Sequence, residues 1–483
     1  MLDHWEEERM LDHPQESCGV FGVIAPSGDV AKLVYFGLYA LQHRGQESAG
    51  ISSYEGAQRT AHVYKAMGLV SQVFHEITLE ELPGNLAIGH TRYSTTGSSR
   101  VVNAQPVVVS TRLGDFSLAH NGNLVNALEL RAELAAQGYT FSSTTDSEGI
   151  AYGVAAAIAT GMDWTEGIIT ALRRCHGAFS LVMAVPGALI GARDLYGVRP
   201  LVLGRMSDGT YILSSETCGL DILSAEFIRD ILPGEMVWID HEGVRSHLWE
   251  PQPQPKLCIF ELIYFARPDS VMRGDSLYSY RMRLGKILAQ EAPVAADIVI
   301  GVPDSGIPAA IGYSQASGIP YAEGLIKNRY VGRTFIQPTQ AMRESGIRMK
   351  LNPLRDVLQG RRVIVIDDSI VRGTTSRKIV RALRNAGATE VHMRISSPPV
   401  THPCFYGIDT DSQDHLIASR LSVSDIARQI EVDSLSYLSE AGMLAATDQD
   451  PSQFCTACFT GKYPITIPEQ LKRTKLLLET AAP

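Results

Sequence analysis

The sequence is poor in the features that mark membrane, secreted and nucleic-acid-binding proteins. No apolar run approaches the roughly 18 residues that a membrane-spanning helix needs. The 17 residues before Cys18 are acidic and have no apolar core, so they resemble neither a secretory signal nor a typical transit peptide. Lysine and arginine total 43 against 52 aspartates and glutamates, and the net charge of −9 argues against general nucleic-acid binding. These absences favour a cytoplasmic enzyme.

Cysteine is also scarce, at 7 residues among 483. An odd number without an export signal indicates free thiols, metal ligation or catalysis rather than disulfides. The sequence has no internal repeat, no long low-complexity tract and no GxxxxGK[ST] loop of the P-loop NTPases. A chain of this length exceeds a single core, so we expect two domains, or three.

Residues 250–256, EPQPQPK, divide the chain into two parts. Alternating prolines make this segment a stiff, extended connector. Before it, strand-like segments alternate with glycine turns, and amphipathic helices are expected over 31–45 and from about Thr145, which indicates α+β layers. After it, 296–302 and 362–368 are continuous apolar runs followed by helical patterns, as in the buried parallel strands of an α/β sheet.

Residues 363–376, VIVIDDSIVRGTTS, are the most specific stretch of the chain. An apolar strand ends in two carboxylates, and a loop then leads to hydroxyl residues that open a helix. N–H and hydroxyl groups at a helix start can hold a phosphate, and paired aspartates can hold ribose hydroxyls or a hydrated Mg²⁺. An acid pair that only caps a helix explains less of the pattern. The residues concerned are Asp367, Asp368, Arg372, Gly373, Thr374, Thr375 and Ser376.

This stretch resembles the phosphoribosyl pyrophosphate (PRPP) signature of the type I phosphoribosyltransferases. The resemblance implies a second loop for pyrophosphate within 301–310, formed by Asp304, Ser305 and Gly306. It also implies a basic flap over 327–350 that closes over pyrophosphate, although a solvated basic loop is the alternative. The flap cations to test first are Lys327 and Arg333, and the Mg²⁺ contacts implied are Ser305, Asp367 and Asp368.

Five short pieces of the first part resemble the glutaminase domain of the N-terminal-nucleophile (Ntn) amidotransferases. They are CGVFGV (18–23), LQHRGQESAGI (41–51), GHTRYSTTG (89–97), HNGNL (120–124) and TTDSE (144–148). With the PRPP signature behind them, nearly all of the chain after residue 17 resembles the amidophosphoribosyltransferases, the first committed enzymes of purine synthesis. The resemblance implies an Ntn-hydrolase glutaminase with αββα layers over 18–250 and a type I phosphoribosyltransferase with a parallel sheet over 251–483.

In this family the nucleophile corresponds to Cys18, which attacks the side-chain amide of glutamine and forms a thioester. The base is the α-amino group of the same cysteine, whose ordinary pKa near ~7.8 suits neutral pH. Cys18 can work in this way only after residues 1–17 are removed, so the leader is expected to be a propeptide cut after Ser17. A plain N-terminal extension before a buried structural cysteine is the alternative.

The resemblance also assigns the other groups that hydrolysis of glutamine needs. Asn121 and Gly122 provide the oxyanion hole. Arg92 binds the carboxylate of the substrate with its planar fork, and Asp146 binds the α-ammonium group. A simple turn is the alternative for Asn121–Gly122, and a helix N-cap is the alternative for Asp146. Tyr93 and Thr95 shape the pocket.

Cys455 and Cys458 form a C-x-x-C pair, which alone is ambiguous among zinc, redox and cluster binding. The family resemblance implies that these two residues, with Cys258 and Cys404, bind one four-iron four-sulfur (4Fe–4S) cluster per chain. Zinc is the alternative, because tetrahedral sulfur sites serve both. The subgroup that carries the cluster is also the one that has a propeptide. The remaining cysteines, Cys175 and Cys218, are expected to pack in the core.

The expected reaction joins both parts of the chain. Glutamine releases ammonia at Cys18, and ammonia displaces pyrophosphate from Mg²⁺-bound PRPP to give 5-phosphoribosylamine. The family further implies a sheltered passage near Tyr264, inhibition by purine nucleotides and a homotetramer. Three alternatives stay open: a hexosamine-phosphate type of amidotransferase, a phosphoribosyltransferase fed by free ammonia, and a non-catalytic regulator that senses PRPP.

Overall fold

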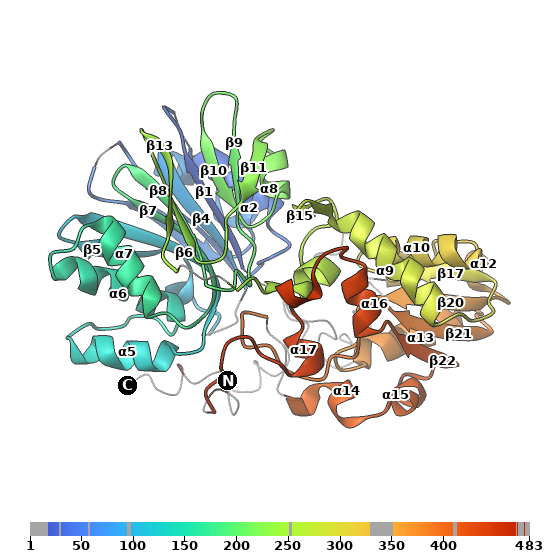
Figure 1. The fold of residues 1–483 in the computed structure, drawn as a ribbon. Coiled ribbons are helices and arrows are strands. Elements are labelled where there is room, and N and C mark those ends of the chain that lie inside the picture. Colours follow the sequence, from blue (N-terminus) through green and yellow to red (C-terminus); the bar gives the residue numbers. More distant parts are fainter. Residues whose placement is uncertain are drawn as a thin grey trace.

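The structure, a computed structural model, describes most of the chain. The described residues are 18–28, 30–56, 58–93, 98–250, 254–328, 351–408, 413–469, 471 and 478. Figure 1 shows two bodies, one formed by the first half of the chain and the other by the second half. Among the described residues, no helix is both long and apolar enough to cross a membrane.

The first body contains two antiparallel sheets. The seven-stranded sheet has the order β11-β9-β10-β1-β4-β2-β3, and the six-stranded sheet has the order β13-β12-β8-β7-β6-β5. The strands of the first sheet are β1 (Gly19–Ile24), β2 (Ser48–Tyr54), β3 (His62–Met67), β4 (Leu86–Arg92), β9 (Val202–Arg205), β10 (Tyr211–Ser214) and β11 (Glu226–Asp230). Those of the second are β5 (Val107–Thr111), β6 (Gly114–Leu124), β7 (Gly177–Val185), β8 (Ala188–Arg193), β12 (Glu235–Asp240) and β13 (Gly243–Leu248).

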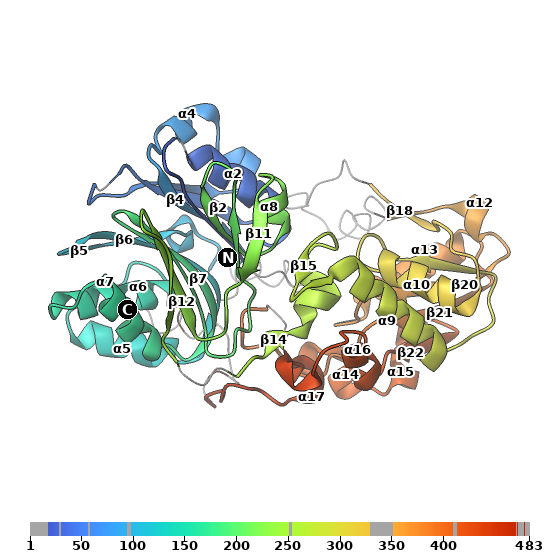
Figure 2. The same ribbon diagram turned by 45° about the horizontal axis from the view of Figure 1, so that its top comes forward.

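Helices cover the outer faces of both sheets, which gives the αββα layers seen in Figure 2. Helix α2 (Ala31–Ala40) packs on the first sheet, and α5 (Ala127–Ala136), α6 (Asp146–Ala159) and α7 (Trp164–Arg173) lie beside the second. Between the sheets, β1, β4 and β7 contribute Val20, Ile88 and Val182, each fully buried. Short helices α3 (Val70–Val73), α4 (Glu76–Glu80), α8 (Cys218–Asp221) and η1 (Val101–Asn103) complete this body.

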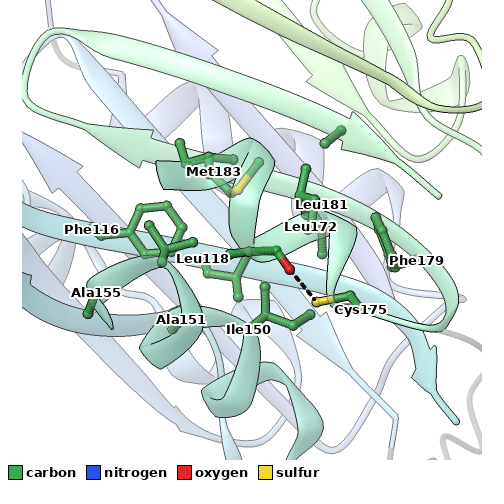
Figure 3. Close-up of a cluster of buried hydrophobic side chains, with 14 of the residues drawn as sticks. Phe116, Leu118, Ile150, Ala151, Ala155, Leu172, Cys175, Phe179, Leu181 and Met183 are labelled. Atoms are coloured by element: carbon green, nitrogen blue, oxygen red, sulfur yellow. Dashed lines mark hydrogen bonds between the residues drawn. The ribbon is translucent and has the colours of Figure 1, made fainter. Parts of the chain in front are cut away.

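The core between the six-stranded sheet and its helices is almost entirely apolar (Figure 3). Phe116 and Met183 from the sheet meet Ile150 and Leu172 from the helices, and all are at most 1% exposed. Burial of such side chains contributes about 1.5–3 kcal/mol each. Cys175 belongs to this cluster, and its thiol donates to the main-chain oxygen of Ala171 in α7 at 3.3 Å, so it packs as expected.

The second body is built on a parallel sheet of order β17-β20-β21-β22. Apolar side chains fill both faces: one face meets helices α9 and α10, and the other meets α13 and α15. The bounds are β17 (Ile298–Gly301), β20 (Arg362–Asp367), β21 (Glu390–Ile395), β22 (Ser434–Tyr437), α9 (Leu277–Glu291), α10 (Ile307–Ser317), α13 (Thr374–Asn385) and α15 (Val423–Ile430).

Smaller elements surround this sheet and the junction with the first body. They are β14 (Leu257–Cys258), η2 (Glu261–Phe265), β15 (Val271–Met272), β16 (Asp275–Ser276), β18 (Leu325–Lys327), β19 (Leu351–Pro353), α12 (Arg355–Leu358), η3 (Gln413–His415), α14 (Ile417–Arg420), α16 (Glu440–Ala445), η4 (Pro451–Gln453), β23 (Phe454–Cys455) and α17 (Ala457–Thr460). The element η2 is a π-helical turn directly after the proline-rich connector and β14.

The predicted fold class is confirmed in both bodies. The helix expected over 31–45 is shorter than predicted, because it ends at Ala40 and the chain turns through Leu41, whose N–H donates to Gly37. The boundary predicted at residues 250 and 251 stays a prediction. It falls between the end of β13 and the start of β14.

Candidate active site

Cys18 lies immediately before β1, which is an inner strand between β10 and β4. It is 6% exposed, and its thiol donates to the main-chain oxygen of Tyr93 at 3.4 Å. The carbonyl oxygen of Cys18 accepts a hydrogen bond from Nε of Arg44 at 3.1 Å. Burial raises the pKa of the Cys18 thiol, so a nearby base must remove its proton before attack.

Two charged residues predicted to bind glutamine lie within electrostatic range of this thiol. Arg92 ends β4, which pairs with β1, and its guanidinium donates to the main-chain oxygen of Ser98 at 3.2 Å. Asp146 is the first residue of α6. Burial is the largest influence on the pKa of the Cys18 thiol and raises it. The charge of Arg92 lowers this pKa, and the charge of Asp146 raises it. The structure therefore brings these three residues together.

Asp146 keeps its negative charge in a buried position. Burial alone would raise the pKa of this carboxyl, but His120 and hydrogen bonds, including one of 2.8 Å from the N–H of Leu124, hold the pKa below its usual value. The N-cap position of α6 belongs to Thr145, so the N-cap interpretation of Asp146 is wrong. A buried carboxylate of this kind can bind an ammonium group.

Asn121 and Gly122 lie inside strand β6, so the interpretation of this pair as a simple turn is also wrong. The side chain of Asn121 is fully buried, and neither its Nδ2 nor its Oδ1 finds a hydrogen-bond partner among the residues that the structure describes. Gly122 has a φ of +148°, and a Cβ at this position would lie 2.0 Å from the oxygen of Ala178. An unsatisfied buried amide beside an obligatory glycine suits a site for a developing oxyanion.

The two predicted phosphate loops lie at one edge of the parallel sheet. Strands β17 and β20 are neighbours, and the loops that follow their carboxyl ends carry Asp304–Gly306 and Asp368–Gly373, respectively. The loop after β17 crosses the end of β20 closely, because a Cβ on Gly306 would lie 2.4 Å from the oxygen of Ile366. Ligands of open α/β sheets bind at this kind of crevice.

Asp367 ends β20 and Asp368 begins the loop, and both are 1% exposed. The N–H of Asp368 donates to Oδ1 of Asp367 at 3.0 Å, and the hydroxyl of Ser369 donates to Oδ2 of Asp368 at 2.8 Å. Gly373 caps the N-terminus of α13 with a φ of +81°, which favours glycine. The predicted hydroxyl residues Thr374, Thr375 and Ser376 form the first turn of that helix.

Lys327 ends β18, and its Nζ lies 2.6 Å from Oδ2 of Asp304. Both side chains are substantially exposed, so this pair contributes little to stability. It does place a cation beside the first phosphate loop. Arg333 and most of the predicted flap lie outside the described residues, as does Thr95 of the predicted glutamine pocket.

The four cysteines predicted to bind a cluster come from distant segments and converge. Cys258 in β14 lies opposite Cys455 in β23 in a parallel pair, and Cys458 follows in α17. The pKa of Cys458 is raised well above its usual value. Burial is the largest cause, and the charges of the other three cysteines add to it. Burial likewise raises the pKa of Cys258 to about 12. Within the described part of the chain, no three His, Cys, Asp or Glu side chains are arranged to hold a single metal ion.

Comparison with known proteins agrees with this two-site arrangement. Residues 90–221 match the glutamine amidotransferase domain family, and residues 281–396 match the phosphoribosyl transferase domain family. The amidophosphoribosyltransferase of Synechococcus elongatus is 66% identical over 472 residues, which cover 97% of this chain and 95% of the relative. The chain belongs to the amidophosphoribosyltransferase family. The amidophosphoribosyltransferase of Mycobacterium bovis is 51% identical, and the match covers 98% of this chain and 91% of the relative.

A solved structure of this family has the same fold. The glutamine PRPP amidotransferase from B. subtilis, complexed with ADP and GMP, is 47% identical and superimposes with a TM-score of 0.87, covering 94% of this chain and 98% of its own. Both domain families therefore occur in one chain, as in full-length amidophosphoribosyltransferases. A hexosamine-phosphate type of amidotransferase accounts for the first half only, and a phosphoribosyltransferase without a glutaminase accounts for the second half only.

Sequence reasoning missed a group of buried charges next to Cys18. Arg44 donates to Cys18 and also contacts Glu216 and Glu261, and Arg199 contacts Glu261 as well. The only sequence signal was that Arg44 lies within LQHRGQESAGI, a piece that resembles the glutaminase family. The glutamates carry no local pattern that connects them with the site.

Proposed function

We propose that the chain transfers the amide nitrogen of glutamine to PRPP, which yields 5-phosphoribosylamine, pyrophosphate and glutamate in the first step of purine synthesis. The observation that carries this proposal is that one chain of this family holds a buried Cys18 near Arg92 and Asp146, and also two predicted phosphate loops at a parallel sheet edge. Each site carries side chains suited to one half of the reaction.

In the first half-reaction, the free α-amino group of Cys18 takes the thiol proton, and the sulfur bonds to the amide carbon of glutamine. The side-chain N–H of Asn121 and the main-chain N–H of Gly122 stabilise the oxyanion. Protonated by the same amine, the nitrogen leaves as ammonia, and water then hydrolyses the thioester to glutamate. Arg92 and Asp146 hold the carboxylate and ammonium groups of the substrate, and Tyr93 and Thr95 shape the pocket.

In the second half-reaction, ammonia attacks the anomeric carbon of PRPP and pyrophosphate leaves. The first turn of α13, with Arg372 and Gly373 before it, holds the 5-phosphate, whereas the loop Asp304–Gly306 holds pyrophosphate with Lys327 and Arg333. Ser305, Asp367 and Asp368 would hold Mg²⁺, and their oxygen donors suit it. When bound, the ion neutralises charge on the leaving pyrophosphate.

We further propose that ammonia passes along η2, where Tyr264 lies. Arg281 supports this route, because its guanidinium donates to the main-chain oxygens of Leu262 at 2.9 Å and Ala266 at 2.6 Å, one on each side of Tyr264. The negative charge of Asp368 in the PRPP loop also acts on Arg281. Arg281 thus holds the main chain of η2 within electrostatic range of the PRPP loop.

We also propose that Cys258, Cys404, Cys455 and Cys458 bind a 4Fe–4S cluster. The four thiols come from three segments of the chain and act on one another electrostatically, and four thiolates are the donor set that such a cluster takes. Zinc stays the alternative, because a tetrahedral site of four sulfurs serves both.

Four finer proposals complete this function. Residues 1–17, which lie outside the described residues, would be a propeptide removed before Cys18. Purine nucleotides would inhibit the enzyme, since the B. subtilis relative was solved with ADP and GMP. A homotetramer is supported by exposed apolar side chains on the edge strand β11, namely Phe227 and Ile228. We place the enzyme in the cytoplasm.

The first experiment is an intact mass and a visible absorption spectrum of protein purified without air. A chain that begins at Cys18 and absorbs broadly in the visible region supports both the propeptide and the cluster. The second is an assay of Cys18→Ala with glutamine and with ammonium as nitrogen donors. We expect the glutamine-dependent rate to vanish and the ammonium-dependent rate to persist. A variant that still uses glutamine would exclude Cys18 as the nucleophile.

A further inference from the structure

A fully buried group of charges joins the two bodies next to Cys18. Arg44 and Arg199 come from the first body, and Glu261 comes from η2 of the second. The side chains of all three are 0% exposed. Nη2 of Arg44 donates to both carboxylate oxygens of Glu261 at 2.8 and 3.0 Å, and Nη1 of Arg199 donates to Oε1 at 2.8 Å. One carboxylate therefore bridges two arginines.

Each arginine uses the rest of its guanidinium to hold a main-chain carbonyl. Nε of Arg44 donates to the oxygen of Cys18 at 3.1 Å. Nε and Nη2 of Arg199 donate to the oxygen of Tyr406 at 2.9 and 2.8 Å. Because a guanidinium is a rigid planar fork, fixing one edge of Arg44 on Glu261 also fixes the direction in which its Nε points. The position of the Cys18 carbonyl thus depends on a residue of the other body.

A second glutamate, Glu216, makes the reverse contact, from the first body to the second. Glu216 belongs to the first body and also contacts Arg44, but it accepts hydrogen bonds from the second body as well, at 2.7 Å from the hydroxyl of Ser270 and at 2.9 Å from the N–H of Arg267. Burial alone would raise the pKa of Glu261, yet the charges of Arg44 and Arg199 hold it below its usual value. Burial alone would also raise the pKa of Glu216, but the charges of His43 and Arg44 hold it below its usual value, so both glutamates are charged.

We propose that Glu261 is a positioning residue for glutamine hydrolysis, which holds Arg44 against the carbonyl of Cys18 from the other domain. The inference rests on the proposed function of Cys18 as the nucleophile. Once the leader is removed, a terminal cysteine is tethered on one side only, so a contact to its own carbonyl controls the direction of both its sulfur and its amine. Small misplacements of reacting groups can cost about 10²-fold in rate.

Glu261→Gln tests the proposal, because glutamine keeps the size of the side chain but cannot accept from both arginines as a carboxylate. We expect kcat with glutamine to fall by about 10–100-fold. The KM for glutamine should change less than about threefold, since Arg92 and Asp146 are untouched, and the ammonium-dependent rate with PRPP should stay within about twofold of wild type. A purely structural role would lower both rates together.

Glu235→Gln is the matched control. Glu235 is a buried glutamate of β12 that accepts from Arg229 at 2.7 and 2.8 Å and from the hydroxyl of Ser246, away from Cys18. The Glu235→Gln substitution should lower the melting temperature and leave kcat with glutamine unchanged. The proposal is overturned if Glu261→Gln keeps the wild-type kcat with glutamine, if it loses both rates equally, or if the control loses the same fraction of kcat.

Should Glu261→Gln be insoluble, Glu261→Asp decides, because aspartate keeps the charge and shortens the side chain by one methylene. A loss of kcat with glutamine alone supports the proposal, and an unchanged kcat overturns it. Failure of the proposed function has a different signature. In that case Cys18→Ala retains the glutamine-dependent rate, whatever the Glu261 variants show.

Discussion

Replacing Asn121 by alanine should separate activity from stability. In the structure, the side-chain amide is fully buried, and neither polar atom has a hydrogen-bond partner within the described part of the chain. A buried unsatisfied polar group costs about 1–3 kcal/mol. Removing it offsets the packing that alanine loses, so Asn121→Ala should lower the free energy of unfolding by no more than about 1 kcal/mol, or raise it.

The expected shift in melting temperature follows from the size of the domain. One kcal/mol corresponds to roughly 2–4 °C for a domain of about 150–250 residues. Asn121→Ala should therefore melt no more than about 4 °C below wild type. Its kcat with glutamine should fall about 10²–10³-fold, the typical cost of losing one oxyanion-hole donor. The ammonium-dependent rate should not change.

Asn103→Ala is the matched comparison for stability. Asn103 is also buried, at 2% exposed, but its Nδ2 donates to the oxygen of Ser98 at 2.8 Å and its Oδ1 accepts from the N–H of Thr144 at 3.0 Å. Leaving these partners unsatisfied costs about 1–3 kcal/mol, or roughly 2–12 °C. Thermal melts of both variants provide the test. If Asn121→Ala falls as far as Asn103→Ala and keeps its activity with glutamine, the amide is structural and our reasoning is refuted.

Three further predictions concern the other sites. Burial alone would raise the pKa of Asp146, but His120 and hydrogen bonds hold this pKa below its usual value. The stability that the charged carboxylate contributes is therefore present above about pH 3.9 and is lost as the pH falls through the folded pKa. The difference in melting temperature between wild type and Asp146→Asn should therefore be visible at pH 7 and shrink in acid, and a constant difference would contradict this. Asp367→Asn should raise the Mg²⁺ concentration for half-maximal ammonium-dependent activity by at least about tenfold, whereas an unchanged titration would exclude Asp367 as a ligand. Cys455→Ser should give poorly soluble protein, because assembly of the proposed cluster would be coupled to folding, and soluble, active, iron-free protein would count against this.

The sequence predicts the fold well where the signal is local. The apolar run at 362–368 becomes β20, whose residues Val363 to Ile366 are fully buried between helices on both faces. The helix expected from about Thr145 begins at Asp146. The one clear error in length, the helix over 31–45, arises because the chain turns after Ala40 and Arg44 reaches Cys18 instead of continuing the helix. Tertiary contacts overrode the amphipathic pattern there.

The candidate site is predictable from sequence only as far as motifs extend. Cys18, Arg92 and Asp146 could be named because each lies in a short piece that resembles a known family. Glu261 could not, since its bond to Arg44 joins residues 217 positions apart and no periodicity or spacing links them. The interpretation of Asn121–Gly122 as a turn failed for a related reason, because strand pairing with β7 decides that conformation.

The exchange of glutamates explains why the proline-rich connector is not an energetic boundary. Composition alone suggests two bodies that could be cut apart near residue 250, yet Glu216 accepts from the second body and Glu261 accepts from the first. Separating the two halves there would leave Arg44 and Arg199 without Glu261, and removing one partner of a buried ion pair typically costs about 3–5 kcal/mol. Because Arg44 also holds the carbonyl of Cys18, the same separation would release the proposed nucleophile. If Glu261 positions Cys18 as proposed, glutamine hydrolysis depends on contacts that only the joined domains make.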